Sequence, residues 1–119
     1  MTIADFIGQL FLARDITHTA HLSTRSFAKH SALGAFYEAV IPLADALAEA
    51  YQGRVALIGK IPLQSVKESK DIVKFLQGQL GELEAGRKDI LPDDSAIQNI
   101  IDEIVALYLS TLYKLRFLA

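Results

Sequence analysis

Apolar residues recur at three- and four-residue spacing in four separate segments, and this period constrains the fold more than any other feature. The segments cover about residues 3–20, 27–52, 63–84 and 94–117. Such spacing puts apolar side chains on one face of an α-helix, and no segment shows the alternation typical of a strand. Amphipathic helices bury their apolar faces against one another. The sequence therefore predicts an all-α protein, a four-helix bundle forming one domain over residues 1–119.

The ends of the predicted helices carry recognisable signals. Thr2 and Asp5 have the spacing of a capping box at the start of the first helix, and Gly53 ends the second. Pro42 lies inside the second helix, where we expect a kink or a loosened hydrogen bond near residue 38. The linker 53–62 is apolar for a loop, which favours a packed connection lying across the bundle, with room for a short strand or turn.

Composition narrows the classes of function. The chain has no cysteine, so disulfides and thiolate chemistry are excluded, and a metal would be held by histidine and carboxylate. A formal charge of −2 and a pI near 5.9 give no general attraction to nucleic acid, and DNA binding is not predicted. No uninterrupted apolar run reaches eighteen residues, and Asp5 stands where a secretory signal would be basic. We expect a soluble, cytoplasmic protein without a membrane partner.

The apolar content also bears on assembly. Hydrophobic residues make up 51% of the chain, and the mean hydropathy is +0.27. These values are high for a small soluble domain, so part of the apolar surface is expected to be buried between subunits. We predict that the protein associates with itself, as a homodimer or a higher homo-oligomer.

Histidines and carboxylates gather around the second predicted helix. The candidate metal ligands are His18, His30, Asp45 and Glu49. With the apolar stripe of the second helix set at zero, His30 lies at roughly 60°, Asp45 at roughly 120° and Glu49 at roughly 160°. They form a flank beside the core stripe, joined by Glu38, and this flank would meet a neighbouring subunit more readily than its own bundle. Imidazole with carboxylate suits iron, Mn²⁺ or Zn²⁺.

Taken one at a time, these residues also have ordinary structural readings. A lone histidine at a helix end usually caps the helix or lies on the surface, and an acidic pair one turn apart is usually a solvated face. A non-catalytic helical module that serves a structural or interaction role therefore stays open as the alternative function. A small-ligand pocket between helices is a third option, for which the sequence offers no polar constellation of its own.

The spacing of these four residues resembles the ferroxidase signature of the Dps-like mini-ferritins, which belong to the ferritin-like superfamily. The intervals are His18-x11-His30-x14-Asp45-x3-Glu49, with "F-x-x-H" around Phe27 and "DALAE" at 45–49. The resemblance implies a ferritin-like fold in which His18 and His30 of one subunit, with Asp45 and Glu49 of another, hold iron. It also implies a possible enzyme, a ferroxidase that oxidises Fe(II) with peroxide or oxygen.

The chain also departs from the pattern of that family. Thr19 and Ala20 stand where the family usually has tryptophan and asparagine, His21 is additional, and Ala50 replaces a common arginine. Residues 53–62 leave no room for the small helix of the family's dimer interface. The resemblance therefore extends to a dimer with two intersubunit sites and not to a closed twelve-subunit shell. The compact form is also similar to small ferritin-like proteins of unknown function found in bacteriophages.

Overall fold

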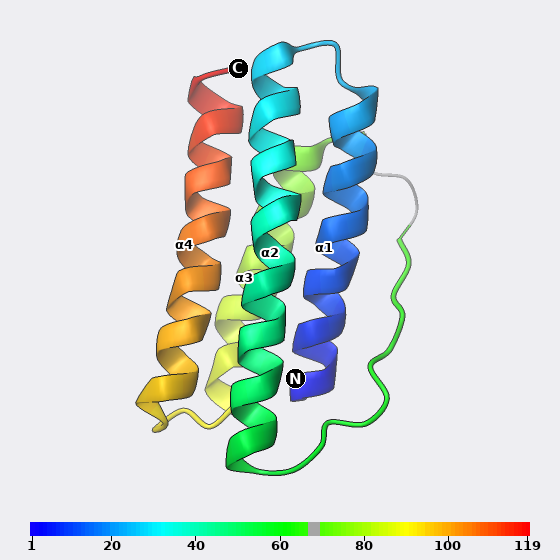
Figure 1. Ribbon diagram of the computed structural model, residues 1–119. Coiled ribbons are helices and arrows are strands. Elements are labelled where there is room, and N and C mark those ends of the chain that lie inside the picture. Colours follow the sequence, from blue (N-terminus) through cyan, green and yellow to red (C-terminus); the bar gives the residue numbers. More distant parts are fainter. Residues whose placement is uncertain (67–69) are drawn as a thin grey trace.

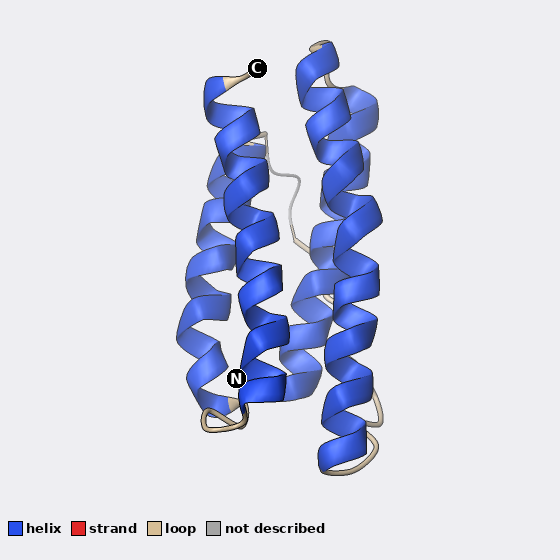
Figure 2. Ribbon diagram, turned by 60° about the vertical axis from the view of Figure 1, so that its left-hand side comes forward, coloured by secondary structure: helices blue, strands red, loops and turns tan. Residues whose placement is uncertain are grey.

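The computed structural model describes residues 1–66 and 70–119, and these residues form helices and loops without any strand (Figures 1 and 2). A single 3₁₀ turn, η1, joins the last two helices. The elements are α1 (Ile3–Ser23), α2 (Phe27–Arg54), α3 (Ile72–Gly86), η1 (Arg87–Asp89) and α4 (Ser95–Phe117). The prediction of an all-α chain with four helices is confirmed for this part of the molecule.

The order of the helices around the bundle follows from their contacts. α1 packs against α2 and α3, and α4 packs against α2 and α3. α1 and α2 run in opposite directions, as do α3 and α4, whereas α2 and α3 start from the same end of the bundle (Figure 1). The chain between α2 and α3 must therefore return to the end of the bundle where α2 began, and its described part, residues 55–66, runs beside α1 (Figure 1). We call this segment the crossover.

The start of the third helix was predicted wrongly. The expected range began at residue 63, whereas α3 begins at Ile72, with Asp71 as its N-cap. Leu63 is 92% exposed and Val66 is 44% exposed, so the helical spacing of this stretch buries no apolar face. Residues 67–69, which the predicted helix included, lie outside the described residues. The linker 53–62 contains no strand, and only residues 53–54 belong to a helix.

The crossover packs closely against α1 at Gly8, as expected for a packed connection. A Cβ atom at Gly8 would lie 2.8 Å from the carbonyl oxygen of Pro62 and 3.1 Å from Nε2 of Gln64. The first of these is a backbone atom, which cannot move without displacing the crossover. The hydrogen-bond contact of Gln64 Nε2 with the carbonyl of Asp5, at 3.4 Å, lies in the same region.

Replacing Gly8 should therefore destabilise the protein. The change Gly8→Ala is expected to cost about 1–3 kcal/mol of unfolding free energy, the usual range for overpacking, although alanine favours helices more than glycine does. Gly53→Ala is the matched control, because a Cβ there meets no atom within 4 Å. Urea unfolding followed by circular dichroism measures both. Equal stability of the two variants would contradict the close approach of the crossover.

Side-chain caps explain where several helices begin. Thr2 and Asp5 form the predicted capping box, in which the Asp5 N–H donates to Thr2 Oγ1 at 3.1 Å. Asp94 caps α4 and also accepts a hydrogen bond from Arg54 Nε at 2.7 Å. The Arg54 guanidinium holds the pKa of the Asp94 carboxyl below its usual value. This contact ties the end of α2 to the start of α4.

Pro42 does not break the second helix, which continues from Phe27 to Arg54. Since proline has no N–H, the carbonyl of Glu38 loses its donor within the helix. Pro42 and Glu38 are both exposed, so water can reach this turn. The predicted loosening near residue 38 thus falls on the outer side of α2 and leaves its buried stripe continuous.

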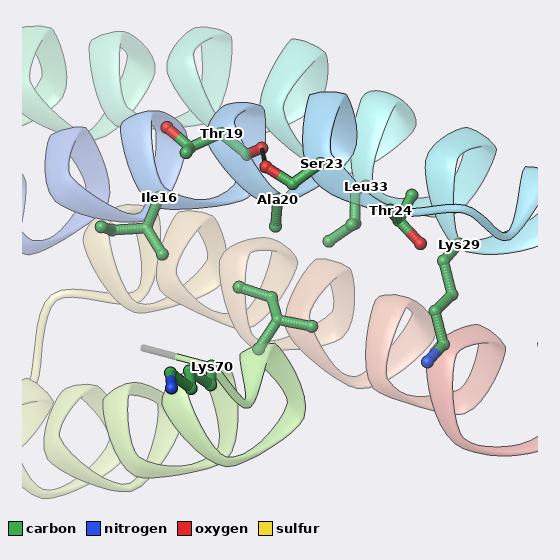
Figure 3. A pocket seen from close by; sticks show the side chains of 9 residues that line it. Ile16, Thr19, Ala20, Ser23, Thr24, Lys29, Leu33 and Lys70 are labelled. Carbon is green, nitrogen blue, oxygen red and sulfur yellow. Dashed lines mark hydrogen bonds between the residues drawn. The ribbon is translucent and has the colours of Figure 1, made fainter. Parts of the chain in front are cut away.

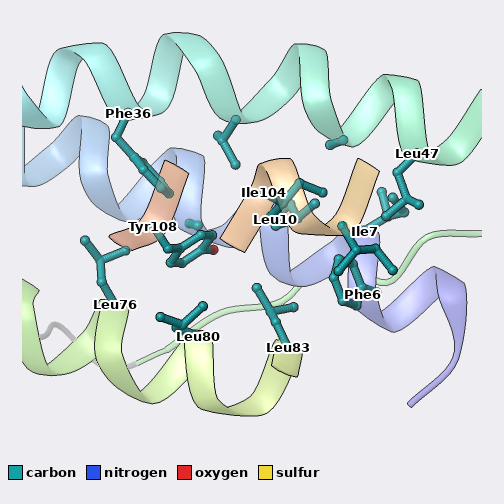
Figure 4. Close-up of a cluster of buried hydrophobic side chains, with 14 of the residues drawn as sticks. Phe6, Ile7, Leu10, Phe36, Leu47, Leu76, Leu80, Leu83, Ile104 and Tyr108 are labelled. Carbon is teal, nitrogen blue, oxygen red and sulfur yellow. The ribbon is translucent and has the colours of Figure 1, made fainter. Parts of the chain in front are cut away.

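The core includes a polar contact between two side chains, Tyr108 and Gln79, among aliphatic and aromatic side chains (Figure 4). Tyr108 is fully buried, lies edge-on to the Phe36 ring at 5.0 Å, and donates its hydroxyl hydrogen to Gln79 Oε1. Gln79 Nε2 donates in turn to the carbonyl of Gln9 at 2.8 Å. Burial raises the pKa of Tyr108 well above its usual value. This chain of hydrogen bonds satisfies the polar groups and links α4, α3 and α1.

Candidate metal site

Three histidines meet where α1 ends and α2 begins. His18 and His21 lie on the last turns of α1, and His30 lies on the first turn of α2. The ring of His21 stacks on that of His30, with centroids 3.6 Å apart and planes 18° from parallel. The ring centroids of His18 and His21 are 6.1 Å apart. The structure therefore brings the two predicted histidine ligands, His18 and His30, to the same end of the bundle.

Tyr37 forms the other side of this histidine cluster. Its ring stacks on His18 at 4.3 Å and lies 5.2 Å from His21. The Arg14 guanidinium lies over the same tyrosine ring, 5.5 Å from its centroid. Stacking uses the faces of the His18 ring, whereas its two ring nitrogens donate or accept in the ring plane. No hydrogen bond within the described chain engages those nitrogens, which leaves them available to a ligand.

The predicted carboxylate ligands lie farther along α2. Asp45 and Glu49 are exposed, as is Glu38, and none takes part in an ion pair with another described residue. Asp45 follows His30 by fifteen positions, which corresponds to about 22 Å along a helix. One chain therefore does not bring the four ligands together. Within residues 1–66 and 70–119, no group of three or more such side chains is arranged to hold a metal ion.

A cleft of about 380 Å³ opens between the end of α1 and the starts of α2 and α3 (Figure 3). Ile16, Leu33 and Ile72 supply apolar lining, whereas Thr19, Ser23, Thr24, Lys29 and Lys70 contribute polar groups. The cleft contains none of the four predicted ligands. Sequence reasoning missed it, because its polar residues come from separate elements and share no spacing along the chain.

Sequence reasoning also left His21 without a role. The residue stands outside the four-residue pattern, yet it contacts the predicted ligand His30 more closely than any other ring does. The sequence does indicate that His21 lies near His18, since the two are three residues apart and share one helix face. Assigning the contact with His30 required the path of the turn between α1 and α2.

Comparison with known proteins places the chain in a family. No solved structure matches it. An uncharacterized 14.6 kDa protein of Enterobacteria phage T4, encoded in the mobD-ri intergenic region, is 27% identical over 115 residues, which cover 93% of this chain and 85% of the relative. The model of a family of unknown function, DUF5856, matches residues 21–115, which include His30, Asp45 and Glu49 but not His18. Since this match covers most of its length, the chain belongs to the DUF5856 family.

Proposed function

We propose that this protein is a ferritin-like metal-binding protein that forms a dimer with two intersubunit sites. Each site would combine His18 and His30 of one chain with Asp45 and Glu49 of a second copy. The direction of the helices supports the fold. Ferritin-like bundles differ from simple up-and-down bundles by one long crossover connection, and here such a crossover joins the parallel helices α2 and α3.

The proposal is carried by the spacing of His30, Asp45 and Glu49 along one continuous helix, α2. Consider two copies of α2 that lie antiparallel about a two-fold axis midway between His30 and Glu49, near residues 39 and 40. His30 of one copy then lies opposite Glu49 of the other. With the same axis, Asp45 of the second copy lies level with Gly34 of the first. Gly34 is one helical turn from Tyr37, and the His18 ring stacks on Tyr37. A single axis would therefore set Glu49 opposite His30 and bring Asp45 to the level of the histidine cluster.

The surface of α2 is suited to such pairing. By length and composition α2 could cross a membrane, with an 18-residue window of mean hydropathy 1.3, but only 39% of that window is buried inside one chain. The core helix of a soluble protein can have the same length and hydropathy. In α2, Phe36, Val40 and Leu47 are fully buried. The apolar side chains left outside would be covered by a second copy, which favours a soluble dimer in the cytoplasm of the host cell.

The donor set fits iron as a substrate. Imidazole and carboxylate, without thiolate, suit Fe(II), and also Mn²⁺ or Zn²⁺. Oxidation by peroxide would take one electron from each of two Fe(II) ions, consume two protons and yield two Fe(III) ions and two waters. Asp45 and Glu49 would stabilise the more highly charged product, because each carboxylate adds a negative charge beside the metal. DNA plays no part in this proposal.

Anaerobic loading with Fe(II), followed by peroxide, tests the proposal. The wild-type dimer is expected to bind Fe(II) at a fixed ratio to the chain and then to show ferric absorbance. The double variant His30→Ala, Asp45→Ala should lose both signals, because each site loses one ligand from each chain. Glu103→Ala is the control, an exposed carboxylate on α4 that is far from α2 in sequence. Equal Fe(II) binding and ferric absorbance in the wild type and the double variant would contradict the proposal.

A non-catalytic interaction module is the second candidate, and the surface of α4 favours it. Leu109, Tyr113 and Phe117 are more than half exposed and line a groove between α3 and α4. Exposed apolar surface of this kind is typical of protein contacts. Melting with and without a chelator separates the two candidates, since a bound metal raises the melting temperature by mass action. Protein purified without metal that melts identically in Fe(II) and in chelator would favour the module.

A further inference from the structure

His21 occupies a slot that the neighbouring helix leaves open for it. Its ring crosses from α1 to α2 and lies against Gly34, where a Cβ atom would come within 3.0 Å of Cε1 and 3.2 Å of Nδ1 of that ring. Such distances are shorter than ordinary van der Waals contact, so any larger residue at position 34 would displace the imidazole. Tyr37 and His30 close the slot on other sides.

The two stacked histidines exchange hydrogen bonds with each other's backbone. Nδ1 of His21 lies 2.6 Å from the carbonyl oxygen of His30, and Nδ1 of His30 lies 2.8 Å from the carbonyl oxygen of His21. A carbonyl oxygen only accepts, so Nδ1 must carry the hydrogen in both rings. In a neutral imidazole with a hydrogen on Nδ1, Nε2 holds a free lone pair.

The reciprocal bonds also complete the end of α1. The carbonyl of His21 belongs to the last turn of that helix, where carbonyl groups lack partners inside the helix. The ring of His30 supplies the missing donor. The bond from His30 Nδ1 and the ring stack therefore hold the His30 imidazole in position without any metal, while the bond from His21 Nδ1 holds the His21 ring in the stack.

We propose that His21 is a positioning residue for His30. It holds the His30 ring as the Nδ1–H tautomer and leaves Nε2 as the lone-pair donor that a metal site needs. This inference rests on the proposed function for its purpose, although the tautomer itself is a property of the metal-free protein. Histidine ligands in metal sites commonly donate their other ring N–H to a carbonyl or carboxylate, which fixes their orientation.

The stacking geometry argues against His21 as a ligand to the same ion as His30. The ring centroids are 3.6 Å apart in nearly parallel planes. A metal–nitrogen bond of about 2.0–2.1 Å lies close to the plane of its ring. An ion placed between two stacked rings would force both bonds far out of those planes. His21 therefore supports the ligand His30 and does not share its ion.

The tautomers can be observed directly in metal-free protein. Two-bond ¹H–¹⁵N spectra of protein labelled at histidine distinguish a hydrogen on Nδ1 from one on Nε2. We expect His21 and His30 to be Nδ1–H tautomers in the wild type, with assignments from His18→Gln and His30→Gln. In His21→Ala the carbonyl of residue 21 remains, but the His30 ring loses the stack that holds it against that carbonyl. The ring should then rotate and become a mixture of tautomers. In His21→Gln, the side-chain amide can donate to the carbonyl of His30, as the His21 ring does. This variant should restore part of the Nδ1–H signal of His30.

Glycine variants test the slot without changing a histidine. Gly34→Ala should disturb the His21 and His30 signals, whereas Gly53→Ala, on the same helix, should leave them unchanged. Zn²⁺ titration then gives a second measurement, with affinity expected to fall about 10–100-fold in His21→Ala. Circular dichroism shows whether each variant is folded.

The outcomes separate this inference from the proposed function. A hydrogen on Nε2 of His30 in the wild type, or an unchanged His30 spectrum in both folded His21→Ala and folded Gly34→Ala, overturns the role of His21. If the wild type shows the expected tautomers but binds neither Fe(II) nor Zn²⁺, the proposed function fails while the positioning of His30 by His21 stands.

Discussion

Mixing two variants that each fail to bind iron is expected to restore binding. The first variant combines His18→Ala with His30→Ala, and the second combines Asp45→Ala with Glu49→Ala. In a dimer with intersubunit sites, each variant alone loses both sites. A mixed dimer keeps one complete site, because the intact histidines of one chain face the intact carboxylates of the other. A site built within one chain would recover nothing.

The size of the recovery can be estimated. Random pairing makes half of the dimers mixed, each with one site in place of two, so about a quarter of the wild-type sites should return. The variants would be unfolded together, refolded, and measured by anaerobic Fe(II) binding, with native mass spectrometry counting the mixed dimers. Glu84→Ala with Glu103→Ala, two exposed carboxylates outside α2, controls for lost negative charge. Mixed dimers that bind no iron would contradict the shared site.

The helices were predictable wherever an apolar stripe was buried. The last residues of α1 and α2, Ser23 and Arg54, extend three and two residues beyond the predicted ends, and α4 starts within one residue of its prediction. The predicted start of the third helix was wrong because Val66 continued the helical spacing, although Leu63 and Val66 are both exposed and residues 63–66 are not helical. Spacing reports which face a helix could bury, but burial itself depends on where the crossover leads the chain.

The candidate site was predictable in its parts and not in its assembly. The intervals identified His18 and His30, which the turn between α1 and α2 brings to one end of the bundle. The same rise of 1.5 Å per residue that defines α2 also keeps Asp45 away from them. His21 was missed as a partner of His30 because their contact depends on Gly34. This glycine leaves space for the His21 ring only when α1 packs against α2, which the sequence alone does not show.

Phe36→Ala should destabilise the monomer more than any other change considered. Phe36 is fully buried on α2, and its ring meets the edge of Tyr108 on α4. Removing a buried phenylalanine usually costs about 3–5 kcal/mol, because the surrounding side chains close the cavity only in part. A domain of this kind has about 5–15 kcal/mol of stability in total. Urea unfolding in the presence of chelator measures the loss without a contribution from metal.

Phe27→Ala is the matched comparison, since Phe27 lies on the same helix but is 82% exposed. Its removal should change the unfolding of the monomer by less than about 0.5 kcal/mol. Dimerisation should respond differently, because antiparallel pairing of α2 would cover Phe27 with a second copy, and burial of such a side chain contributes about 1.5–3 kcal/mol. Sedimentation equilibrium should then show a dissociation constant raised about tenfold or more. An unchanged dissociation constant would mean that the two copies do not meet through α2. It would contradict the proposed intersubunit site, which depends on that pairing.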